Sequence, residues 1–420
     1  MAVSVEEALD LIYQNVTSKS TELLPIETAL GRVLAHDVTA VHNLPPYDNS
    51  AMDGYAVKIA DAGKSVNVLH TIFAGDKDDS KIFEGSCTKI MTGAKIPEGT
   101  ECIVPVENTE PNGDEVILPE NLKAGQHIRL CGEDIQADDA LLRSGVRLYA
   151  HHITLLASQG ISHVHLYKKP RVALFASGSE LKMHFEQVES HQLYNTNTPT
   201  FTARVQELGC DVSFIGTAED SLEALHEHIE SALDSDLIIT SGGVSVGDAD
   251  YTKEAFGAFG LEILFDKINI KPGKPTTFGK IGKTAVLNLP GNPLAAALNF
   301  ELFGQSIILA LSGGHEKYLG SLQAEMAEDF KVKQGRRTLI PGFYNGESFK
   351  ASEKFAPGMV SPLAKANGFI MIDETVSMLE KGSSVKVIPT RFTFNCETQT
   401  SLVSVGEEGR GKREEEKNDA

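Results

Sequence analysis

The spacing of apolar residues changes along this chain, and each change marks a different kind of structure. At the start, Ser4 and Glu7 form a capping-box signature ahead of apolar residues at helical spacing, which predicts an N-terminal helix. From residue 45 to about 139 the pattern becomes short β-type runs separated by Gly, Pro and Asn-Gly, which predicts a β-rich insert. Residues 153–159, followed by Gly160, predict a short helix where the chain leaves that insert.

From about residue 169 short apolar strands alternate with amphipathic helices. The expected strands are 172–176, 212–215, 237–240 and 286–289, and the expected helices are 199–208 and 220–233. Such an alternation is typical of a mostly parallel sheet with helices on both faces. The apolar segment 294–311 extends this α/β region. After Gly313 and Gly314 short strands continue to residue 388, which indicates a small final β domain.

Length and composition favour a multidomain globular protein. The chain has 420 residues, which at about 150 per domain predicts about three domains. The 41% of hydrophobic and 23% of charged residues are typical of soluble chains. The formal net charge of −20 disfavours binding to nucleic acid or an anionic membrane through overall charge. We therefore expect neither as a partner.

Cysteine usage and the start of the chain bear on location. The five cysteines are odd in number and never form a C-x-x-C pair, which favours reduced thiols over a zinc site or a disulfide framework. The N-terminus has no basic stretch followed by an apolar run, and no window of about 18 apolar residues is evident. These features predict a cytoplasmic protein.

Two polar turns follow predicted buried strands, where ligands bind in α/β sheets because backbone N–H groups and helix dipoles point there. One turn spans 176–180, and the other spans 240–251. The second combines three glycines, three Ser or Thr hydroxyls and two carboxylates, a composition suited to holding a phosphate together with a divalent cation. The alternative is a flexible turn filled with polar residues.

A third candidate is a basic loop formed by Lys271, Lys274 and the preceding Lys267. Two prolines stiffen this loop and a glycine permits close backbone approach, so oxyanion binding is its natural use. A solvated basic loop is the alternative. The turn 288–293 also follows a strand and precedes the long apolar segment, so we expect it at the same edge of the sheet.

Upstream, polar residues occupy turns within and beside the β-rich insert. Asp53 precedes a glycine, Thr92 lies in the turn-rich stretch 91–99, and Asp134 lies near the end of the insert. Each of them taken alone is typical of an ordinary turn residue. They become candidates for chemistry only in combination.

A different chemistry is suggested by residues 243–247, which fit the G-x-S-x-G nucleophile elbow of α/β-hydrolases with Ser245 as the nucleophile. Such a serine needs an acid and then a histidine further along the chain. Only His315 follows Ser245, at the apparent edge of the α/β region, and no oxyanion-hole loop is evident. The hydrolase hypothesis is therefore disfavoured.

Taken together, these sequence segments closely resemble those of the MoeA family, the molybdopterin molybdenumtransferases that include the E domain of gephyrin. The matching strings occur in the family's order and extend to about residue 389: 48–57, 91–99, 132–135, 177–181, 241–252, 271–278 and 289–293.

The resemblance implies a multidomain α/β plus β architecture. Its expected parts are a helical linker region (1–44 and 140–168), a β-rich insert domain (45–139), a molybdopterin-binding-type α/β domain (169–315), a C-terminal β-barrel (316–392) and a disordered polar tail (393–420). Members of the family are elongated homodimers with an active site between subunits.

The resemblance also implies a reaction. The family inserts molybdenum from molybdate into adenylylated molybdopterin, with Mg²⁺-dependent cleavage of the adenylate and release of AMP. A molybdopterin adenylyltransferase is the expected partner that supplies the substrate. No protein nucleophile is required, because a water or a molybdate oxygen can attack phosphorus once Mg²⁺ and lysines neutralise the charge.

Residue roles follow from the matched positions. Glu180, Asp250 and Asp220 would hold Mg²⁺, although neighbouring Glu219 also fits the position of Asp220. Asp53 and Asp134 would act as catalytic or ion-orienting groups from the facing subunit, while Thr92 would bind a substrate phosphate or an ordered water.

The oxyanions, molybdate among them, would be held by Lys267, Lys271 and Lys274. The remaining expected substrate contacts are Ser177, Gly178, Gly242, Gly243, Ser245, Pro290 and Asn292.

The chain departs from the family pattern in the half of the site that would bind molybdate. Ala295 stands where the family usually has Ser, and Pro341 and Pro357 align with its molybdate-contacting Arg and Ser. Substitutes for these contacts are Arg336, Arg337 or Ser361. The alternative function is therefore a noncatalytic paralogue that binds a pterin nucleotide or acts as a scaffold.

Overall fold

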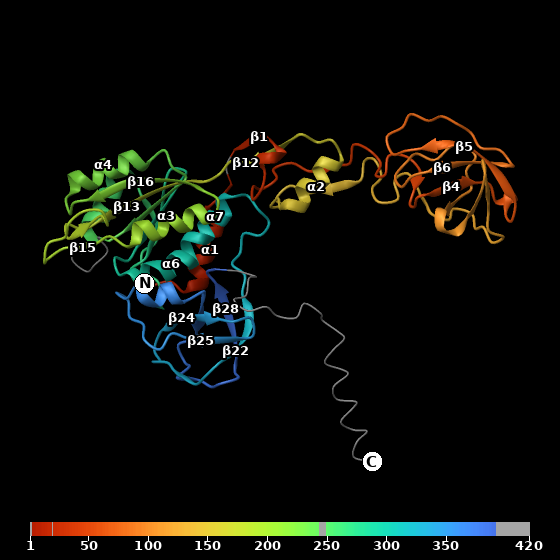
Figure 1. The fold of residues 1–420 in the computed structure, drawn as a ribbon. Coiled ribbons are helices and arrows are strands. Elements are labelled where there is room, and N and C mark those ends of the chain that lie inside the picture. Colours follow the sequence, from red (N-terminus) through yellow and green to blue (C-terminus); the bar gives the residue numbers. More distant parts are fainter. Residues whose placement is uncertain (1, 19, 243–248, 392–420) are drawn as a thin grey trace, which may run out of the picture.

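A computed structural model describes residues 2–18, 20–242 and 249–391 of the chain. The molecule is elongated (Figure 1). The α/β sheet and the C-terminal β structure lie together at one end, the β-rich insert lies at the other, and a small region containing β1, β12 and α2 connects them. The expected tail, 393–420, lies outside the described residues.

The N-terminal helix α1, Val5–Asn15, begins as its sequence predicts. The Ser4 hydroxyl accepts a hydrogen bond from the Glu7 N–H at 3.1 Å, and the Glu7 carboxylate accepts one from the Ser4 N–H at 2.7 Å. The apolar face of the helix buries Val5, Ala8 and Ile12 in the same core as the α/β sheet. This first helix therefore packs with the α/β region.

The connecting region is built from segments on both sides of the insert. Strand β1 (Thr21–Pro25) pairs antiparallel with β12 (His163–Tyr167), and β2 (Val38–Thr39) pairs with β11 (Ala140–Leu142). The predicted short helix is α2, Ala150–Ser158. The segment that leads into the insert and the segment that leads out of it are thus joined by backbone hydrogen bonds into one rod-like connection, called the strut below.

The insert contains a six-stranded sheet in the order β7-β4-β6-β5-β9-β8. Alternate residues of β4 enter two separate cores, with Tyr55 and Val57 on one face and Ala56 on the other, as the period of a strand requires. The bounds of its strands are β3 Asn49–Ser50, β4 Gly54–Val57, β5 Ser65–Ile72, β6 Ser86–Ile90, β7 Cys102–Pro105, β8 Glu110–Asn112, β9 Glu115–Ile117 and β10 Ile128–Arg129.

The α/β domain has a six-stranded sheet in the order β16-β13-β17-β21-β20-β18. The first four strands are parallel; β20 then pairs antiparallel with β21, and β18 pairs antiparallel with β20 at the edge. The strands are β13 Arg171–Ser177, β16 Asp211–Ala218, β17 Leu237–Ser241, β18 Glu262–Phe265, β20 Thr277–Ile281 and β21 Thr284–Leu289. The predicted mostly parallel sheet is confirmed.

Helices cover both faces of this sheet. Helices α3 (Asn197–Glu207) and α6 (Pro293–Asn299) share a core with Val172 and Leu174, whereas α4 (Leu222–Ala232) and α5 (Ala249–Ala258) pack with Ala173 and Phe175. Because side chains alternate along β13, this one strand contributes to both cores. Its uninterrupted apolar sequence follows from burial on both faces.

The apolar segment after β21 is one continuous helical span formed by α6, a π-helical turn at Phe300–Gly304 and α7 (Gln305–Leu311). By length and composition alone Pro293–Leu311 could cross a membrane, with 19 residues and a mean hydropathy of 1.6. This corrects the sequence-based expectation of no such segment, which missed it because polar residues interrupt the run. The most apolar window is 89% buried inside the protein, as befits a core helix.

The C-terminal region forms a closed barrel of five strands, as expected. The strands β24 (Arg337–Tyr344), β25 (Ser348–Ala351), β22 (Leu322–Met326), β28 (Ser384–Pro389) and β26 (Gly368–Ile372) are paired in that order, and β26 pairs back to β24. Shorter elements around it are β23 Phe330–Lys331, β27 Met378–Leu379 and α8 Ser361–Lys365. Strand β19 (Ile270–Lys271), from the α/β part of the sequence, joins β24 in parallel.

The π-helical turn carries a buried ion pair that fixes α3 against the core helix. Glu301 is buried, and its two carboxylate oxygens accept from Nε and Nη2 of Arg204 at 2.7 and 2.8 Å. Arg204 also pairs with Glu207, whose side chain is 63% exposed. The ring of Phe201 stacks on that of Phe300 beside the pair, at 5.2 Å between centroids.

We predict that Glu301→Ala lowers the free energy of unfolding by about 3 kcal/mol, because it leaves the desolvated Arg204 without its bidentate partner. The matched control Glu207→Ala removes an exposed partner of the same arginine and should cost less than about 1 kcal/mol. Denaturant unfolding measures both changes, and equal losses would show that burial of Glu301 is not what makes the pair stabilising.

Candidate functional site at the carboxyl edge of the α/β sheet

A cavity of about 670 Å³ opens where β13, β17 and β21 end. Its lining includes six of the residues singled out from the sequence: Ser177, Gly178, Glu180, Asp220, Gly242 and Asn292. The carboxyl ends of parallel strands meet at one edge, which explains why turns far apart in sequence converge. Gly243 and Ser245 lie outside the described residues, and of Asp250 only its place in α5 is described.

Two of the turns approach each other through glycine. Gly242 has φ +100°, and a Cβ built on it would lie 2.2 Å from the Ser177 carbonyl oxygen. Gly178 has φ +150°, and a Cβ there would meet the Glu180 carboxylate at 2.8 Å. Only glycine permits this approach, which leaves backbone rather than side chains at the wall of the cavity.

We predict that Gly242→Ala lowers the free energy of unfolding by about 2 kcal/mol or more, because a left-handed backbone and a backbone collision are combined. Gly291→Ala is the matched control in the same cavity, since its Cβ would have no neighbour nearer than 3.6 Å. That variant should change stability by less than about 1 kcal/mol. Thermal and denaturant unfolding distinguish the two, and similar stabilities would contradict the close approach.

The cavity contains two carboxylates whose oxygens form no ion pair within the described part of the chain. The Asp220 carboxylate accepts hydrogen bonds from the N–H and hydroxyl of Ser179, at 3.2 and 3.5 Å. Helix α4 is capped by Ser221, so Asp220 does not start the helix as the sequence suggested. Of Glu219 and Asp220, only Asp220 lines the cavity.

This donor set is compatible with Mg²⁺, which prefers oxygen ligands and is commonly held by one or two carboxylates together with substrate phosphates. Glu180 and Asp220 are the two carboxylates that the cavity offers. Within the described residues no three His, Cys, Asp or Glu side chains come close enough to hold an ion by themselves. A cation here would therefore depend on the ligand's own phosphate oxygens.

Residues 194–197 also line the cavity and were not among the candidates predicted from the sequence. The Asn197 amide donates to the Ser241 hydroxyl at 2.6 Å and to the Gly291 carbonyl at 2.8 Å, and the Ser241 hydroxyl donates to the Pro290 carbonyl at 3.1 Å. Pro290 therefore takes part through its backbone carbonyl, which accepts from Ser241, and not through its side chain. Asn195 and Asn197, just before the predicted helix 199–208, were the sequence feature that could have indicated this part of the site.

A short pair of strands brings this segment to the cavity. Strand β14 (Leu181–Lys182) pairs in parallel with β15 (Leu193–Tyr194). Asn195 follows and is buried; its side-chain oxygen Oδ1 accepts from the Thr198 N–H, while its side-chain nitrogen Nδ2 has no hydrogen-bond partner among the described residues. The pairing of β14 with β15 therefore places Asn195, whose side-chain N–H donor has no such partner, in the lining of the cavity.

The three lysines of the basic loop are exposed and do not line this cavity. Lys267 and Lys274 are fixed through their carbonyls, which accept from the N–H groups of Val3 and Ile268 at 3.0 and 2.9 Å. Lys271 lies in β19 and lines a second cavity, of about 440 Å³, beside the barrel. The predicted convergence of lysines with the carboxylates is therefore not seen in a single chain.

The turn between Lys271 and Lys274 is held from behind by Asn299. Its amide donates to the carbonyls of Pro272 and Ala295, at 3.1 and 2.7 Å. Gly273 has φ +103°, and a Cβ there would collide with the same amide at 1.8 Å. The basic loop is thus anchored to the core helix through its backbone, which leaves its charged side chains in solvent.

In the insert, Asp53 and Thr92 meet directly. The N–H and the hydroxyl of Thr92 both donate to Asp53 Oδ1, each at 2.7 Å. The hydroxyl bond, followed by the backbone bond, lowers the pKa of the exposed Asp53 carboxyl below its usual value. Asp134 is exposed in another turn, where its N–H donates to the Leu44 carbonyl at 3.0 Å.

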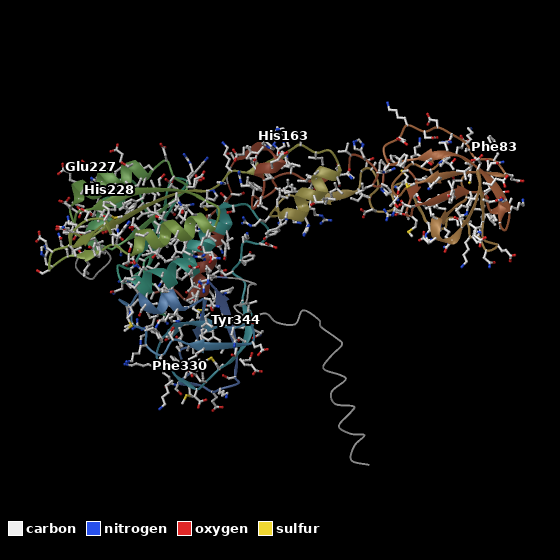
Figure 2. All side chains as sticks on the ribbon, viewed as in Figure 1. Phe83, His163, Glu227, His228, Phe330 and Tyr344 are labelled. Atoms are coloured by element: carbon white, nitrogen blue, oxygen red, sulfur yellow. The ribbon has the colours of Figure 1, made fainter. Side chains whose placement is uncertain are left out.

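The insert that carries Asp53 and Thr92 lies far from the carboxyl-edge cavity in the same chain. Figure 1 shows β4, which follows Asp53, and β6, which ends just before the turn with Thr92, at the opposite end of the molecule from β13. Figure 2 shows the same separation between Phe83 of the insert and His228 of the α/β domain. A single subunit therefore does not bring the two predicted halves of the site together.

We predict that Thr92→Val raises the pKa of Asp53, because it removes the hydroxyl bond that contributes most to the lowering. The backbone N–H bond remains, so the pKa of Asp53 should rise but stay below its ordinary value. Carboxyl-carbon chemical shifts followed against pH measure the change. Thr109→Val in the same domain is the control, and an unchanged Asp53 pKa in Thr92→Val would contradict the assignment.

The positions that depart from the family pattern have structural roles. Pro357 uses its carbonyl to accept from the N–H groups of Leu294 and Ala295, at 2.9 and 3.4 Å. The first amides of α6 are therefore already hydrogen-bonded within the chain. Pro341 is buried in β24, opposite Phe369.

Arg337, one of the proposed substitutes, is engaged elsewhere. It pairs closely with Glu6 of α1 and more distantly, at 3.8 Å, with Asp373. These pairs tie the barrel to the N-terminal helix. Arg336 and Ser361 are exposed.

The hydrolase hypothesis gains no support from the position of His315. Its ring packs against Gly145 of the connecting region, where an added Cβ would lie 2.7 Å from the imidazole. His315 is not part of the cavity lining. His315, the one histidine that follows Ser245 in sequence, therefore contacts the connecting region and not the candidate site.

The fold and the site together define a class of protein. It is an elongated multidomain α/β protein with a glycine-walled cavity and two carboxylates at the carboxyl edge of its sheet, suited to a phosphate-bearing ligand. Comparison with known families makes the class specific. Residues 3–160 match the MoeA N-terminal region (domain I and II), 173–310 a probable molybdopterin binding domain, and 323–390 the MoeA C-terminal region (domain IV).

Relatives extend the match to nearly the whole chain. The molybdopterin molybdenumtransferase of Haemophilus influenzae is 36% identical over 380 residues, covering 88% of this chain and 94% of that protein. The one from Staphylococcus epidermidis is 31% identical over 410 residues, covering 92% and 96%. A molybdopterin biosynthesis MoeA protein from Pyrococcus horikosii has a similar structure, with a TM-score of 0.82, 29% identity and coverage of 94% and 100%. The chain belongs to the MoeA family of molybdopterin molybdenumtransferases.

Proposed function

We propose that this chain inserts molybdenum from molybdate into adenylylated molybdopterin, with Mg²⁺-dependent cleavage of the adenylate and release of AMP. The names of its relatives support the transferase class and a role in molybdenum cofactor biosynthesis. The observation that carries the proposal is the cavity in which the glycine turns at Gly178 and Gly242 meet the carboxylates of Glu180 and Asp220.

Different residues of the cavity would bind the substrate's phosphate and the Mg²⁺ ion. The turns at Gly178 and Gly242 let a phosphate approach the backbone, and the buried amide of Asn195 supplies a donor. Glu180 and Asp220 would hold Mg²⁺ against the substrate's phosphate oxygens. Bound there, the ion supplies positive charge that offsets the repulsion between these carboxylates and the anionic substrate.

We place the complete site between two subunits of a homodimer. The insert, whose strands β4 and β6 adjoin Asp53 and Thr92, lies at the far end of the same chain from the cavity (Figure 1), so a partner's insert would have to supply these residues and Asp134. An elongated subunit is suited to such an exchange. The lowered pKa of Asp53 keeps that carboxyl ionised, as a catalytic or ion-orienting group requires.

The proposed setting is the cytoplasm, with a molybdopterin adenylyltransferase supplying the substrate. The cysteines within the described residues are free, and three of these four are buried. Burial raises the pKa of Cys87 and of Cys210 to about 12, so these thiols stay protonated and unreactive. Such thiols fit a reducing compartment.

The test supplies the purified protein with adenylylated molybdopterin, molybdate and Mg²⁺, and follows AMP release together with molybdenum bound to the pterin. We expect both products to appear. Asp220→Asn and Asp53→Asn should each reduce turnover by about a hundredfold or more, because the first removes a proposed carboxylate ligand of Mg²⁺ and the second removes an ionised catalytic or ion-orienting group. Pterin nucleotide binding without AMP release, in folded wild-type protein, would instead support the noncatalytic paralogue.

Mixing the two inactive variants tests the placement of the site between subunits. If Asp53 and Asp220 act from different subunits, mixed dimers contain one intact site, and random exchange should restore about a quarter of wild-type activity. If they act from the same subunit, no mixture restores activity. The double variant Asp53→Asn/Asp220→Asn, mixed with wild type, controls for effects of protomer exchange alone.

A further inference from the structure

The strut contains a pair of histidines that no role assigned above uses. His36 lies just before β2, on the segment that leads into the insert, and His165 lies in β12, on the segment that leads out of it. The centroids of their imidazole rings are 4.4 Å apart, and the ring planes make an angle of 33°. Two side chains that the whole insert separates in sequence are therefore in contact.

The backbone around this pair is fixed by the fold of the strut. The Ala35 N–H donates to the His165 carbonyl at 2.8 Å. Next to this bond, Leu34 forms an antiparallel bridge with Leu166, and both leucines are buried in the apolar core of the connecting region. The two histidines are therefore held beside each other by main-chain pairing and by packing beneath them.

A bend in the chain brings His36 to its neighbour. In a regular strand His36 would share the face of the buried Leu34, because side chains alternate between the two faces. The chain bends at His36 instead, and both His36 and His165 are exposed. The pair is therefore accessible from solvent.

The ring nitrogens of the pair are available to a ligand. Within the described residues, neither imidazole forms a hydrogen bond or an ion pair, and the ring contact is the interaction that they make. His163, which Figure 2 labels in the connecting region, differs, because its Nδ1 lies 3.0 Å from the Ser162 hydroxyl. Since a neutral imidazole has one nitrogen that can bind a metal ion, His36 and His165 offer two such ligands side by side.

Two adjacent imidazoles favour one class of ion. Imidazole nitrogen suits zinc and its neighbours among the transition metals, whereas Mg²⁺ prefers oxygen ligands. A histidine nitrogen lies about 2.0–2.1 Å from a zinc ion, so two nitrogens that share the ion are at most about 4.2 Å apart. Exposed rings with centroids 4.4 Å apart are compatible with that limit.

Water would complete the coordination. In the part of the chain that the structure describes, no group of three His, Cys, Asp or Glu side chains could hold a metal ion. A site made by two histidines therefore keeps open positions, which in zinc proteins are taken by water or by another ligand.

We propose that His36 and His165 form a binding site for a divalent transition metal ion of the zinc class. The bound ion joins the segment that leads into the insert to the segment that leads out of it, and so braces the strut. This site uses none of the residues assigned to the proposed function and does not depend on turnover.

The experiment titrates Zn²⁺ into the untagged full-length protein by calorimetry, with excess Mg²⁺ present to occupy sites made of oxygen ligands. Wild-type protein should show a binding event that His36→Ala and His165→Ala each weaken at least about tenfold, because the loss of even an outer-shell partner of a metal ligand commonly costs that much. His163→Ala is the matched control, since it removes an exposed histidine from the same strand and should leave the affinity unchanged. Circular dichroism confirms that each variant is folded.

A second measurement tests whether the ion braces the folded chain. Zn²⁺ should raise the melting temperature of wild-type protein and of His163→Ala, but not that of either pair variant, because an ion that binds the folded chain stabilises it. Unchanged Zn²⁺ affinity in both pair variants would overturn the proposal. Equal weakening by His163→Ala would also overturn it, because the ligands would then be His163 and His165 of a single strand.

Discussion

The carboxyl-edge cavity depends on a close approach between two backbone turns, where Gly242 lies against the carbonyl of Ser177. The Asn197 amide completes this contact by bonding both the Ser241 hydroxyl and the Gly291 carbonyl. The ends of β13, β17 and β21 are thus held together by this backbone contact and by the side-chain amide of Asn197. The backbone at this point of the wall is packed closely enough that a Cβ at Gly242 would collide with the Ser177 carbonyl.

The elongated shape follows from how the connecting region is built. Two crossings of the chain pair with each other at β1 with β12 and at β2 with β11, so the strut between insert and α/β sheet is hydrogen-bonded along much of its length. Such a strut keeps the insert at a distance from its own sheet.

Local sequence patterns were enough to predict much of the fold. The capping box at Ser4, the alternating strands and helices, and the final β domain each depend on residues that are neighbours in sequence. The convergence of Gly178, Asp220 and Gly242 could also be predicted, because the carboxyl ends of parallel strands share an edge. The family resemblance added the closed barrel, which periodicity alone did not reveal.

What the sequence could not place depends on contacts between distant residues. Nothing local to Asn197 indicates that it bonds Gly291, and nothing local to Lys271 indicates that it faces a barrel formed later in the chain. The core helix escaped a search for uninterrupted apolar runs because polar residues interrupt it, and the burial of Glu301 depends on its pairing with Arg204, which is distant in sequence. These partners become visible only when the chain is folded.

The position of β19 has a consequence for how this protein can be divided. In sequence Ile270 and Lys271 belong to the α/β part, but their backbone pairs with Arg337 and Thr338 at the start of β24. A cut anywhere between these two stretches would leave a strand with the wrong fragment. The barrel is therefore not an exchangeable module: recombination that replaced it alone would have to recreate the edge to which β19 binds.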